Sequence, residues 1–177
     1  CLAVRDHVGV LDLPGFSRFN LSGAGAADWL NKQMTGKLPR VGRMGLAYFS
    51  DEAGRIVTET SVMRHAEDHF TLITAAAAEW HDFDLLNSRL PEGLSLTDHT
   101  SEFGTLIVSG PKSRDLLSVL TDGDLSLPWL SHQSAKVAGL PAALARVSFA
   151  GELGWEIHAE MQHIPAIYDA VLAGGAK

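Results

Sequence analysis

Hydrophobic and polar residues alternate most clearly over residues 146–158, which read RVSFAGELGWEIH. Val147 and Phe149 fall on one face of an extended chain, the two-residue period of a strand with one buried side. Two glycines then interrupt the pattern, which resumes through Ile157. Because glycine adopts positive φ at little steric cost, this segment predicts a bulged strand or a tight hairpin.

The rest of the chain predicts a mixture of strands and helices. Alternating or β-branched stretches predict strands at residues 17–22, 45–50, 55–64, 68–74, 94–99, 105–109 and 135–137. Helical spacing predicts helices at residues 26–34, 75–90, 110–120 and 164–172. A turn at residues 51–54 makes the strands over 45–74 an antiparallel meander.

This order of elements lacks the regular βαβ alternation of a doubly wound sheet. It predicts an α+β fold of antiparallel sheets with flanking helices, in two packed subdomains. Residues 1–92 are expected to form the first subdomain, with a strand, a helix, the meander and a helix. Residues 93–177 are expected to form the second, whose order is close to a ferredoxin-like sandwich.

Composition limits the function classes. The 177 residues are 46% hydrophobic and 20% charged, which suits one globular domain or two small ones. The net charge of -7 argues against a nucleic-acid partner, and no apolar run is long enough to predict a membrane span. The single cysteine, Cys1, excludes internal disulfides and a cysteine-built zinc cage, so no metal is expected. The chain starts without methionine and stops just after a helix, so we expect it to be part of a longer polypeptide.

Two glutamates, Glu152 and Glu156, flank the second glycine of the opening segment. Taken alone they fit a solvated hairpin. The motif GELGWE, preceded by SFA and followed by IH, resembles the signature of the folate-binding aminomethyltransferase family. This family includes the glycine-cleavage aminomethyltransferase and the C-terminal halves of dimethylglycine and sarcosine dehydrogenases. The resemblance implies that Glu156 holds the pterin ring, with Phe149, in place of the usual tyrosine, and Trp155 as further ligand-binding residues. A carboxylate suits this role because it accepts both parallel N–H donors of an aminopyrimidine edge.

A second segment, SDEAGRIVTETSVMRH at residues 50–65, resembles the family's Asn-Glu-x-Gly-Gly-Ile-Leu-Asp-Asp-Leu. Thr58 and Glu59 stand where the family has its aspartate pair, which implies Glu59 as the catalytic, proton-handling residue and Thr58 as a ligand contact. Thr74 is a further candidate contact, beside Ala75, which replaces a family asparagine. The alternative for Glu59 is an exposed strand glutamate paired with a nearby arginine.

The resemblance covers nearly the whole chain and is closest to the dimethylglycine and sarcosine dehydrogenase branch. It implies a tetrahydrofolate-binding, one-carbon transfer region that forms methylenetetrahydrofolate from an iminium made elsewhere. The chain has no Gly-x-Gly-x-x-Gly fingerprint, so FAD is expected only in a flavin-dependent domain of the same or a partner chain. The family's C-terminal barrel is also missing, and we expect the fragment alone to be inactive. Expected locations are the cytoplasm or, in a eukaryote, the mitochondrial matrix, and a homo-oligomer is possible.

Two alternatives stay open. One is the aminomethyltransferase of glycine cleavage, disfavoured by the missing aspartate pair and by Ala75. The other is a non-catalytic folate-binding or scaffolding module, favoured by the departures at Phe149 and Ala150. Two geometric expectations accompany the main hypothesis. Glu156 should line a pocket with Trp155 on the opposite face, and Glu59 should face the same cleft as Glu156.

Overall fold

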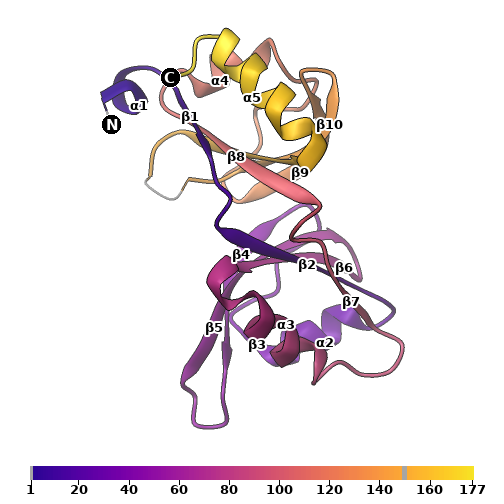
Figure 1. Cartoon of the computed structure of the whole chain (residues 1–177). Helices are drawn as coiled ribbons and strands as arrows, with labels where there is room; N and C mark the ends of the chain where they lie inside the picture. Colours follow the sequence, from indigo (N-terminus) through magenta and orange to yellow (C-terminus); the bar gives the residue numbers. More distant parts are fainter. Residues whose placement is uncertain (1, 149–150) are drawn as a thin grey trace. The chain divides into compact units, whose positions relative to one another are not determined.

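The structure is a computed structural model that describes residues 2–148 and 151–177, and it divides into two compact units. Gly15–Thr100 form one, which we call the central unit. The residues up to Pro14 and Ser101–Lys177 form the other, which we call the terminal unit. Both appear in Figure 1, where each contains one sheet with helices packed on it. Two antiparallel sheets with flanking helices confirm the predicted α+β class.

The central unit is a six-stranded antiparallel sheet in the order β3-β4-β5-β6-β2-β7. Its strands are β2 (Phe16–Ser22), β3 (Met34–Thr35), β4 (Met44–Ser50), β5 (Ile56–Ala66), β6 (His69–Ala75) and β7 (Ser95–Asp98). Its helices are α2 (Ala26–Gln33) and α3 (Glu79–Asn87), with a short 3-10 helix, η1 (Ala76–Ala78), before α3. The adjacent strands β4, β5 and β6 confirm the predicted meander.

One face of this sheet is buried under α2 and α3. Alternate residues of β2 point toward the helices, and Phe19 and Leu21 are fully buried there. Phe19 meets Phe83 of α3 edge to face, with ring centroids 5.5 Å apart. Trp29 and Leu30 of α2 complete the same core. The helical stripes therefore serve packing, and the opposite face of the sheet carries polar side chains together with apolar ones such as Leu46 and Met63.

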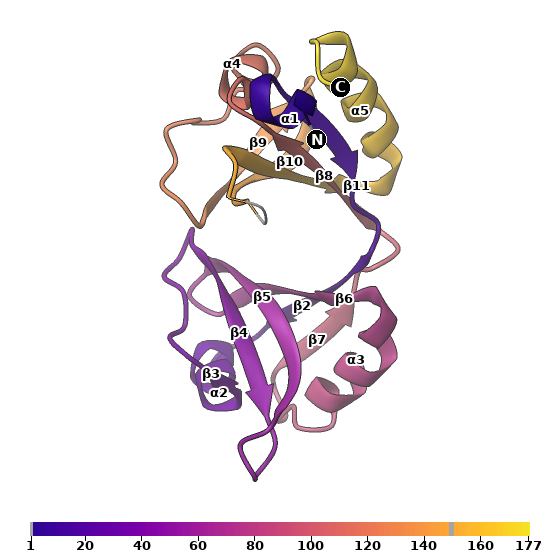
Figure 2. The ribbon, with the colours of Figure 1, turned by 90° about the vertical axis from the view of Figure 1, so that its left-hand side faces the viewer.

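The terminal unit is a five-stranded sheet in the order β1-β8-β11-β10-β9. Its strands are β1 (Gly9–Asp12), β8 (Phe103–Ser109), β9 (Ser131–Val137), β10 (Leu140–Arg146) and β11 (Gly154–Glu160). Its helices are α1 (Leu2–Asp6), α4 (Ser113–Ser118) and α5 (Ile164–Ala173), with a 3-10 helix, η2 (Met161–His163), before α5. In Figure 2, α4 and α5 lie over one face of the sheet, the layer arrangement of the predicted sandwich.

The division of the chain differs from the expected one at residues 92 and 93. β1 pairs with β8, so the first fourteen residues belong with the C-terminal half. β7 pairs with β2, so the strand expected to open the second subdomain extends the first sheet instead. Local alternation predicts that a strand exists but carries no information about a partner far along the chain. Pairing across such distances was therefore beyond the sequence pattern.

The signature segment forms a hairpin with a wider connection than predicted. β10 ends at Arg146 and β11 begins at Gly154, so residues 147–153 connect the strands and Val147 lies outside them. Phe149 and Ala150 fall outside the described residues. At Gly154 a Cβ atom would lie 2.9 Å from the carbonyl oxygen of Val147, closer than real Cβ atoms come. The glycine therefore lets the connection pass close against the start of β11.

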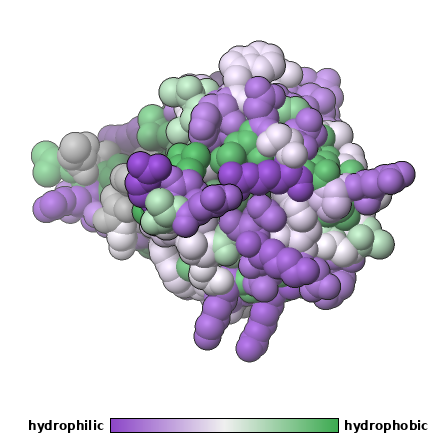
Figure 3. All heavy atoms as spheres, turned by 90° about the horizontal axis from the view of Figure 1, so that it is seen from below, coloured by the Kyte–Doolittle hydropathy of each residue, from purple (hydrophilic) through white to green (hydrophobic). Residues whose placement is uncertain are grey.

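The surface of the molecule mixes polar and apolar groups. Figure 3 shows one face, where hydrophilic atoms are widespread and hydrophobic atoms appear in patches between them. Some large apolar side chains are well exposed, such as Trp80 at 78% and Ile56 at 64%. Scattered exposed apolar residues are ordinary on protein surfaces and carry no functional conclusion by themselves.

Helix α2 is capped from a distant part of the chain. Its N-cap residue, Gly25, has no side chain to bond the free N–H groups of the first turn. The Asp68 carboxylate, in the turn between β5 and β6, accepts these bonds from Gly25 N at 3.1 Å and Ala27 N at 2.9 Å. The bond from Ala27, followed by that from Gly25, lowers the pKa of Asp68. The cap ties the helix to the hairpin.

We expect Asp68→Asn to lower the thermal unfolding midpoint at neutral pH, because the neutral amide is a weaker acceptor at the positive end of the helix. A lowered folded pKa stabilises the fold above the ordinary value of 3.8, and that contribution is lost as pH falls through the lowered pKa. The difference in unfolding midpoint between wild type and Asp68→Asn should therefore become smaller at acidic pH. Glu92→Gln, an exposed change in the same unit, is the control, and a gap independent of pH would contradict the capping role.

Candidate functional site

The alternation of β11 separates its side chains into two sets. Trp155 and Ile157 are fully buried in the core that α4 and α5 cover. Glu156 lies between them and His158 follows Ile157, so Glu156 and His158 point to the other face, which we call the site face. Register places Ala145 of β10 and Ile107 of β8 on either side of Glu156. The structure thus puts Glu156 and Trp155 on opposite faces, as the sequence pattern predicts.

The Glu156 carboxylate lies next to an imidazole. Its Oε2 atom lies 3.2 Å from Nε2 of His158, and 22% of the Glu156 side chain is exposed. Nδ1 of His158 lies 3.0 Å from the hydroxyl of Thr105, the residue directly opposite on β8. Both His158 and Thr105 are buried. Glu156 is therefore partly accessible, and the groups behind it are fixed.

A pocket of about 280 Å³ adjoins this row of side chains. Its lining residues are Val4, Gly9, Val10, Leu11, Ile107, Ser109, Ser148 and Lys177. Leu11 and Ile107 pair in register, and Ile107 also pairs with Glu156, so pocket and carboxylate share one side of the sheet. Glu156 itself is not among the lining residues. The pocket is mainly apolar and lies near the small end of ligand sites, which hold roughly 300–1,000 Å³.

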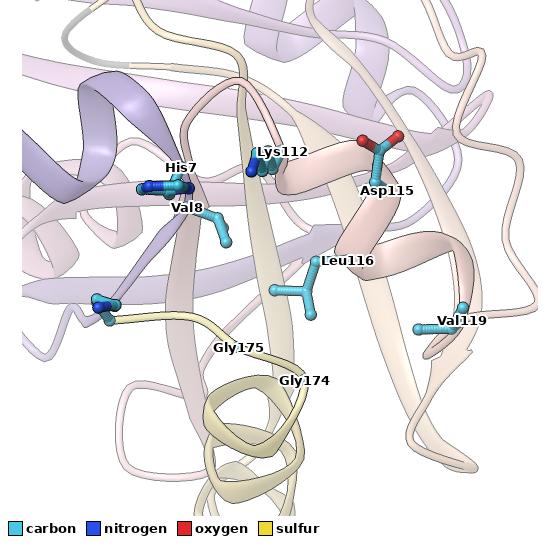
Figure 4. A pocket seen from close by; sticks show the side chains of 9 residues that line it. His7, Val8, Lys112, Asp115, Leu116, Val119, Gly174 and Gly175 are labelled. Carbon is cyan, nitrogen blue, oxygen red and sulfur yellow. The ribbon is translucent and has the colours of Figure 1, made fainter.

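A larger pocket of about 460 Å³ lies between α4 and the C-terminal stretch (Figure 4). Its lining residues are His7, Val8, Lys112, Asp115, Leu116, Val119, Gly174, Gly175 and Lys177. In Figure 4, Leu116 points toward Gly174 and Gly175, whereas the Asp115 carboxylate points away from them. None of the predicted site residues lines this pocket.

The connection between β10 and β11 is held by Arg146. Its Nη1 donates to the carbonyl oxygen of Gly154 at 3.0 Å. The guanidinium also lies 5.5 Å from the ring centroid of Trp155 and 5.8 Å from that of Trp129. Burial and, next, the nearby Arg114 hold the pKa of Arg146 below its usual range. Glu152 lies half-buried in this connection, while Phe149 lies outside the described residues.

In the central unit, Glu59 lies on the face opposite α2 and α3. It is exposed, and register places it directly opposite Tyr48 of β4. A hydrogen bond between the two side chains, followed by slight burial and the carboxylate charge, raises the pKa of Tyr48. Glu59 belongs to the central unit and Glu156 to the terminal unit, and a shared cleft stays a prediction.

Thr58 and Thr74 point to the helix-covered face instead. The Thr58 hydroxyl donates to Oδ2 of Asp82 in α3 at 2.9 Å, and Asp82 is fully buried. Thr74 is also buried, and its hydroxyl has no hydrogen-bond partner among the described residues. Strand alternation therefore separates these two threonines from Glu59. Their role as ligand contacts stays a prediction.

Sequence reasoning missed His158, Thr105 and Tyr48. A signal existed for His158, which follows Glu156 by two residues and so shares its face in any strand. Thr105 and Tyr48 become neighbours of the glutamates only through strand pairing, and the sequence gives no local indication of that. Within the part of the chain that the structure describes, histidine, cysteine and carboxylate side chains form no group of three suited to a metal.

Over the same described residues, no helix has the length and apolar character to cross a membrane.

A family model for the GCVT N-terminal domain matches residues 1–177. The chain belongs to this family. The assignment confirms the family named from the signature motif.

Known proteins related to the chain are longer. The chain is 32% identical over 180 residues to mitochondrial dimethylglycine dehydrogenase of Homo sapiens, covering 98% of this chain and 21% of that protein. It is 28% identical over 179 residues to an aminomethyltransferase of Geobacillus kaustophilus, covering 99% of this chain and 49% of that protein. The chain thus spans about a fifth of the first relative and about half of the second.

Solved structures support the same fold. Glycine cleavage system aminomethyltransferase T from Bartonella henselae superposes with a TM-score of 0.83 at 21% identity, over 97% of this chain and 47% of that one. Heterotetrameric sarcosine oxidase from Corynebacterium sp. U-96 gives a TM-score of 0.73 at 20% identity, over 96% of this chain and 86% of that one. At these identities the likeness concerns the fold.

The Tyr48–Glu59 contact predicts a measurable titration. The raised pKa of Tyr48 means that the pair stabilises the fold below the ordinary tyrosine value of 10.0, and the contribution is lost as pH rises through the raised pKa. We expect Glu59→Gln to lower the midpoint of Tyr48 ionisation, because removing the carboxylate removes both the acceptor and the charge. Tyrosinate absorbance reports Tyr48 alone in a Tyr168→Phe background, since the chain has 2 tyrosines. Glu52→Gln is the control, and equal midpoints in both variants would remove Glu59 as the partner.

Proposed function

We propose that this chain is the tetrahydrofolate-binding, one-carbon transfer region of a protein similar to dimethylglycine and sarcosine dehydrogenases. One observation carries the proposal. Glu156, the glutamate of the motif that resembles the family's signature, stands partly accessible on the site face, and a buried imidazole lies against one of its oxygens. A carboxylate in that setting is preorganised to accept hydrogen bonds from a planar ligand.

The surroundings of Glu156 fit the chemistry of a pterin ring. An aminopyrimidine edge presents parallel N–H donors, and each carboxylate oxygen offers two lone pairs, so Oε2 can accept from the ligand while His158 is near. The neighbours in register are Ala145 and Ile107, which add only hydrocarbon beside the carboxylate. The adjoining apolar pocket, bounded by Leu11 and Ile107, offers burial for a flat ring. These residues would hold the ring by one polar edge and apolar faces.

Glu59 is the proposed proton-handling residue. Bound tetrahydrofolate supplies the nucleophilic nitrogen that takes up the one-carbon unit. Glu59 is exposed, and its carboxylate accepts a hydrogen bond from the Tyr48 hydroxyl. Such a carboxylate can hold a proton or balance positive charge near the reacting nitrogen, provided that Glu59 and Glu156 serve the same ligand. Its extra methylene relative to aspartate sets how far the carboxylate reaches.

Oxidation of the amine is assigned to another domain. We propose a flavin-dependent domain of the same or a partner chain, consistent with relatives named as dehydrogenases and as subunit alpha of sarcosine oxidase. The mitochondrial relatives favour the mitochondrial matrix in a eukaryote, and the cytoplasm is the counterpart in a bacterium. A glycine-cleavage aminomethyltransferase is the second candidate, since a relative named as an aminomethyltransferase matches the chain over 99% of its length. The Thr58–Glu59 pair in place of two aspartates favours the first candidate.

Glu156→Gln should weaken tetrahydrofolate binding. The amide keeps the size of the side chain but replaces one acceptor by a donor and removes the charge. Hydrogen bonds to a charged group are worth about 1.5–3 kcal/mol, so the dissociation constant should rise roughly ten- to hundredfold. Titration calorimetry measures it, with Glu152→Gln in the neighbouring connection as the matched control. An unchanged affinity in Glu156→Gln would rule out the proposed ring anchor.

Glu59→Gln should separate binding from transfer. With the amine-oxidising domain present, we expect tetrahydrofolate affinity to change little while methylene transfer slows by about a hundredfold, the lower range for a general acid or base. Single-turnover formation of methylenetetrahydrofolate measures the second quantity, and Glu52→Gln in the turn before β5 is the control. A transfer rate equal to that of the control would show that Glu59 takes no part in the chemistry.

A further inference from the structure

We infer that His158, with Thr105, is a positioning residue that sets the orientation of the Glu156 carboxylate for its ligand. The inference rests on the proposed function, because it needs Glu156 to bind the ligand. The imidazole reaches Glu156 on one side at 3.2 Å and the Thr105 hydroxyl on the other at 3.0 Å. Exposures of 3% for His158 and 7% for Thr105 show that both side chains are packed in place.

The three side chains lie on one face because of strand geometry alone. Glu156 and His158 are two residues apart on β11, and Thr105 is opposite His158 on β8. The residues opposite Glu156 and His158 on β10 are Ala145 and Ala143, so only methyl groups lie next to the pair on that side. His158 therefore restrains Oε2, while small neighbours leave room beside the carboxylate for a ligand.

A hydrogen bond from His158 to Glu156 requires one tautomer of the imidazole. A carboxylate only accepts, so the nitrogen nearest Glu156, Nε2, must carry a proton to bond it. In a neutral imidazole Nδ1 is then the acceptor, and the Thr105 hydroxyl is the donor to it. Thr105 thus selects the tautomer that presents N–H to Glu156.

The contact between His158 and Glu156 is close but not fully aligned. The Nε2–Oε2 separation is 3.2 Å, while the angles fall outside those of a hydrogen bond. A small rotation of the carboxylate would align it, as catalytic and binding contacts commonly tighten when the ligand arrives. The restraint on Glu156 is therefore strongest in the complex, and the expected effect is on ligand affinity more than on folding.

Two substitutions at His158 separate positioning from packing. His158→Gln keeps an N–H donor near the position of Nε2, whereas His158→Leu keeps bulk and removes the donor. We expect His158→Leu to weaken tetrahydrofolate binding about tenfold, or about 1.4 kcal/mol, and His158→Gln to restore most of it. Thr105→Val should weaken binding in the same direction, and Thr105→Ser should not. Equal affinities for His158→Leu and wild type, or equal losses in the Leu and Gln variants, would overturn the inference.

A cycle with Glu156→Gln tests whether His158 acts through Glu156. In the Glu156→Gln background His158→Leu should add little further loss, because the oriented carboxylate is already gone. Additive losses would instead assign His158 an independent role and refute positioning. If Glu156→Gln itself binds normally, the proposed function fails and the inference falls with it. If Glu156→Gln binds weakly but both His158 variants bind normally, only the inference fails.

The tautomer gives a readout that needs no ligand. Nitrogen-15 chemical shifts of His158 should report a protonated Nε2 and an unprotonated Nδ1 at pH above the titration of histidine. Thr105→Val should shift this pattern toward a mixture of tautomers, and Thr105→Ser should keep it. A folded protein with His158 protonated only on Nδ1 would refute the assigned hydrogen bonds, even if His158→Leu proved unable to fold.

Discussion

Burial of Trp155 is the constraint on which the site depends. Roughly 150–250 Å² of tryptophan surface, at about 25 cal/mol per Å², favours the buried state by about 4–6 kcal/mol as an upper bound. A one-residue slip of β11 would expose Trp155 and drive Glu156 under α4 and α5. The core therefore fixes the direction of the carboxylate. The best-defined feature of the site, the direction of the Glu156 side chain, thus follows from packing on the opposite face of the sheet.

The start of β11 is fixed by the same tryptophan. Arg146 lies over the Trp155 ring and donates to the carbonyl oxygen of Gly154, so the connection between β10 and β11 is tied to the core rather than left to the strand ends. Gly154 permits this because its missing side chain leaves room for the backbone at Val147. The first residues of β11, which precede Glu156, are thereby tied to the core.

The alternation and turn residues predicted the strands and turns that depend on residues close together in the sequence. The meander, the strand that ends at Ser22 and the signature motif all follow from alternation and turn residues, and the structure contains them. The pairing of β1 with β8 and of β7 with β2 joins segments far apart in sequence, which alternation cannot specify. The same limit hid Thr105 and Tyr48. Adjacent residues of a strand point to opposite faces, so alternation places Thr58 and Glu59 on different faces of the sheet. Only the motif resemblance had grouped the two residues in one site.

Each proposed glutamate is backed by another side chain, and a physical reason links the two cases. Within a sheet the backbone N–H groups are used by neighbouring strands, so a carboxylate on its face finds its donors in side chains or in water. Glu156 meets a buried imidazole, whereas Glu59 is itself exposed and meets the hydroxyl of the half-buried Tyr48. A buried partner fixes geometry, which suits recognition of a rigid ring. A less buried partner leaves an exposed carboxylate free to exchange protons with its surroundings, which suits proton handling. The different burial of the partners, rather than the glutamates themselves, supports assigning them different roles.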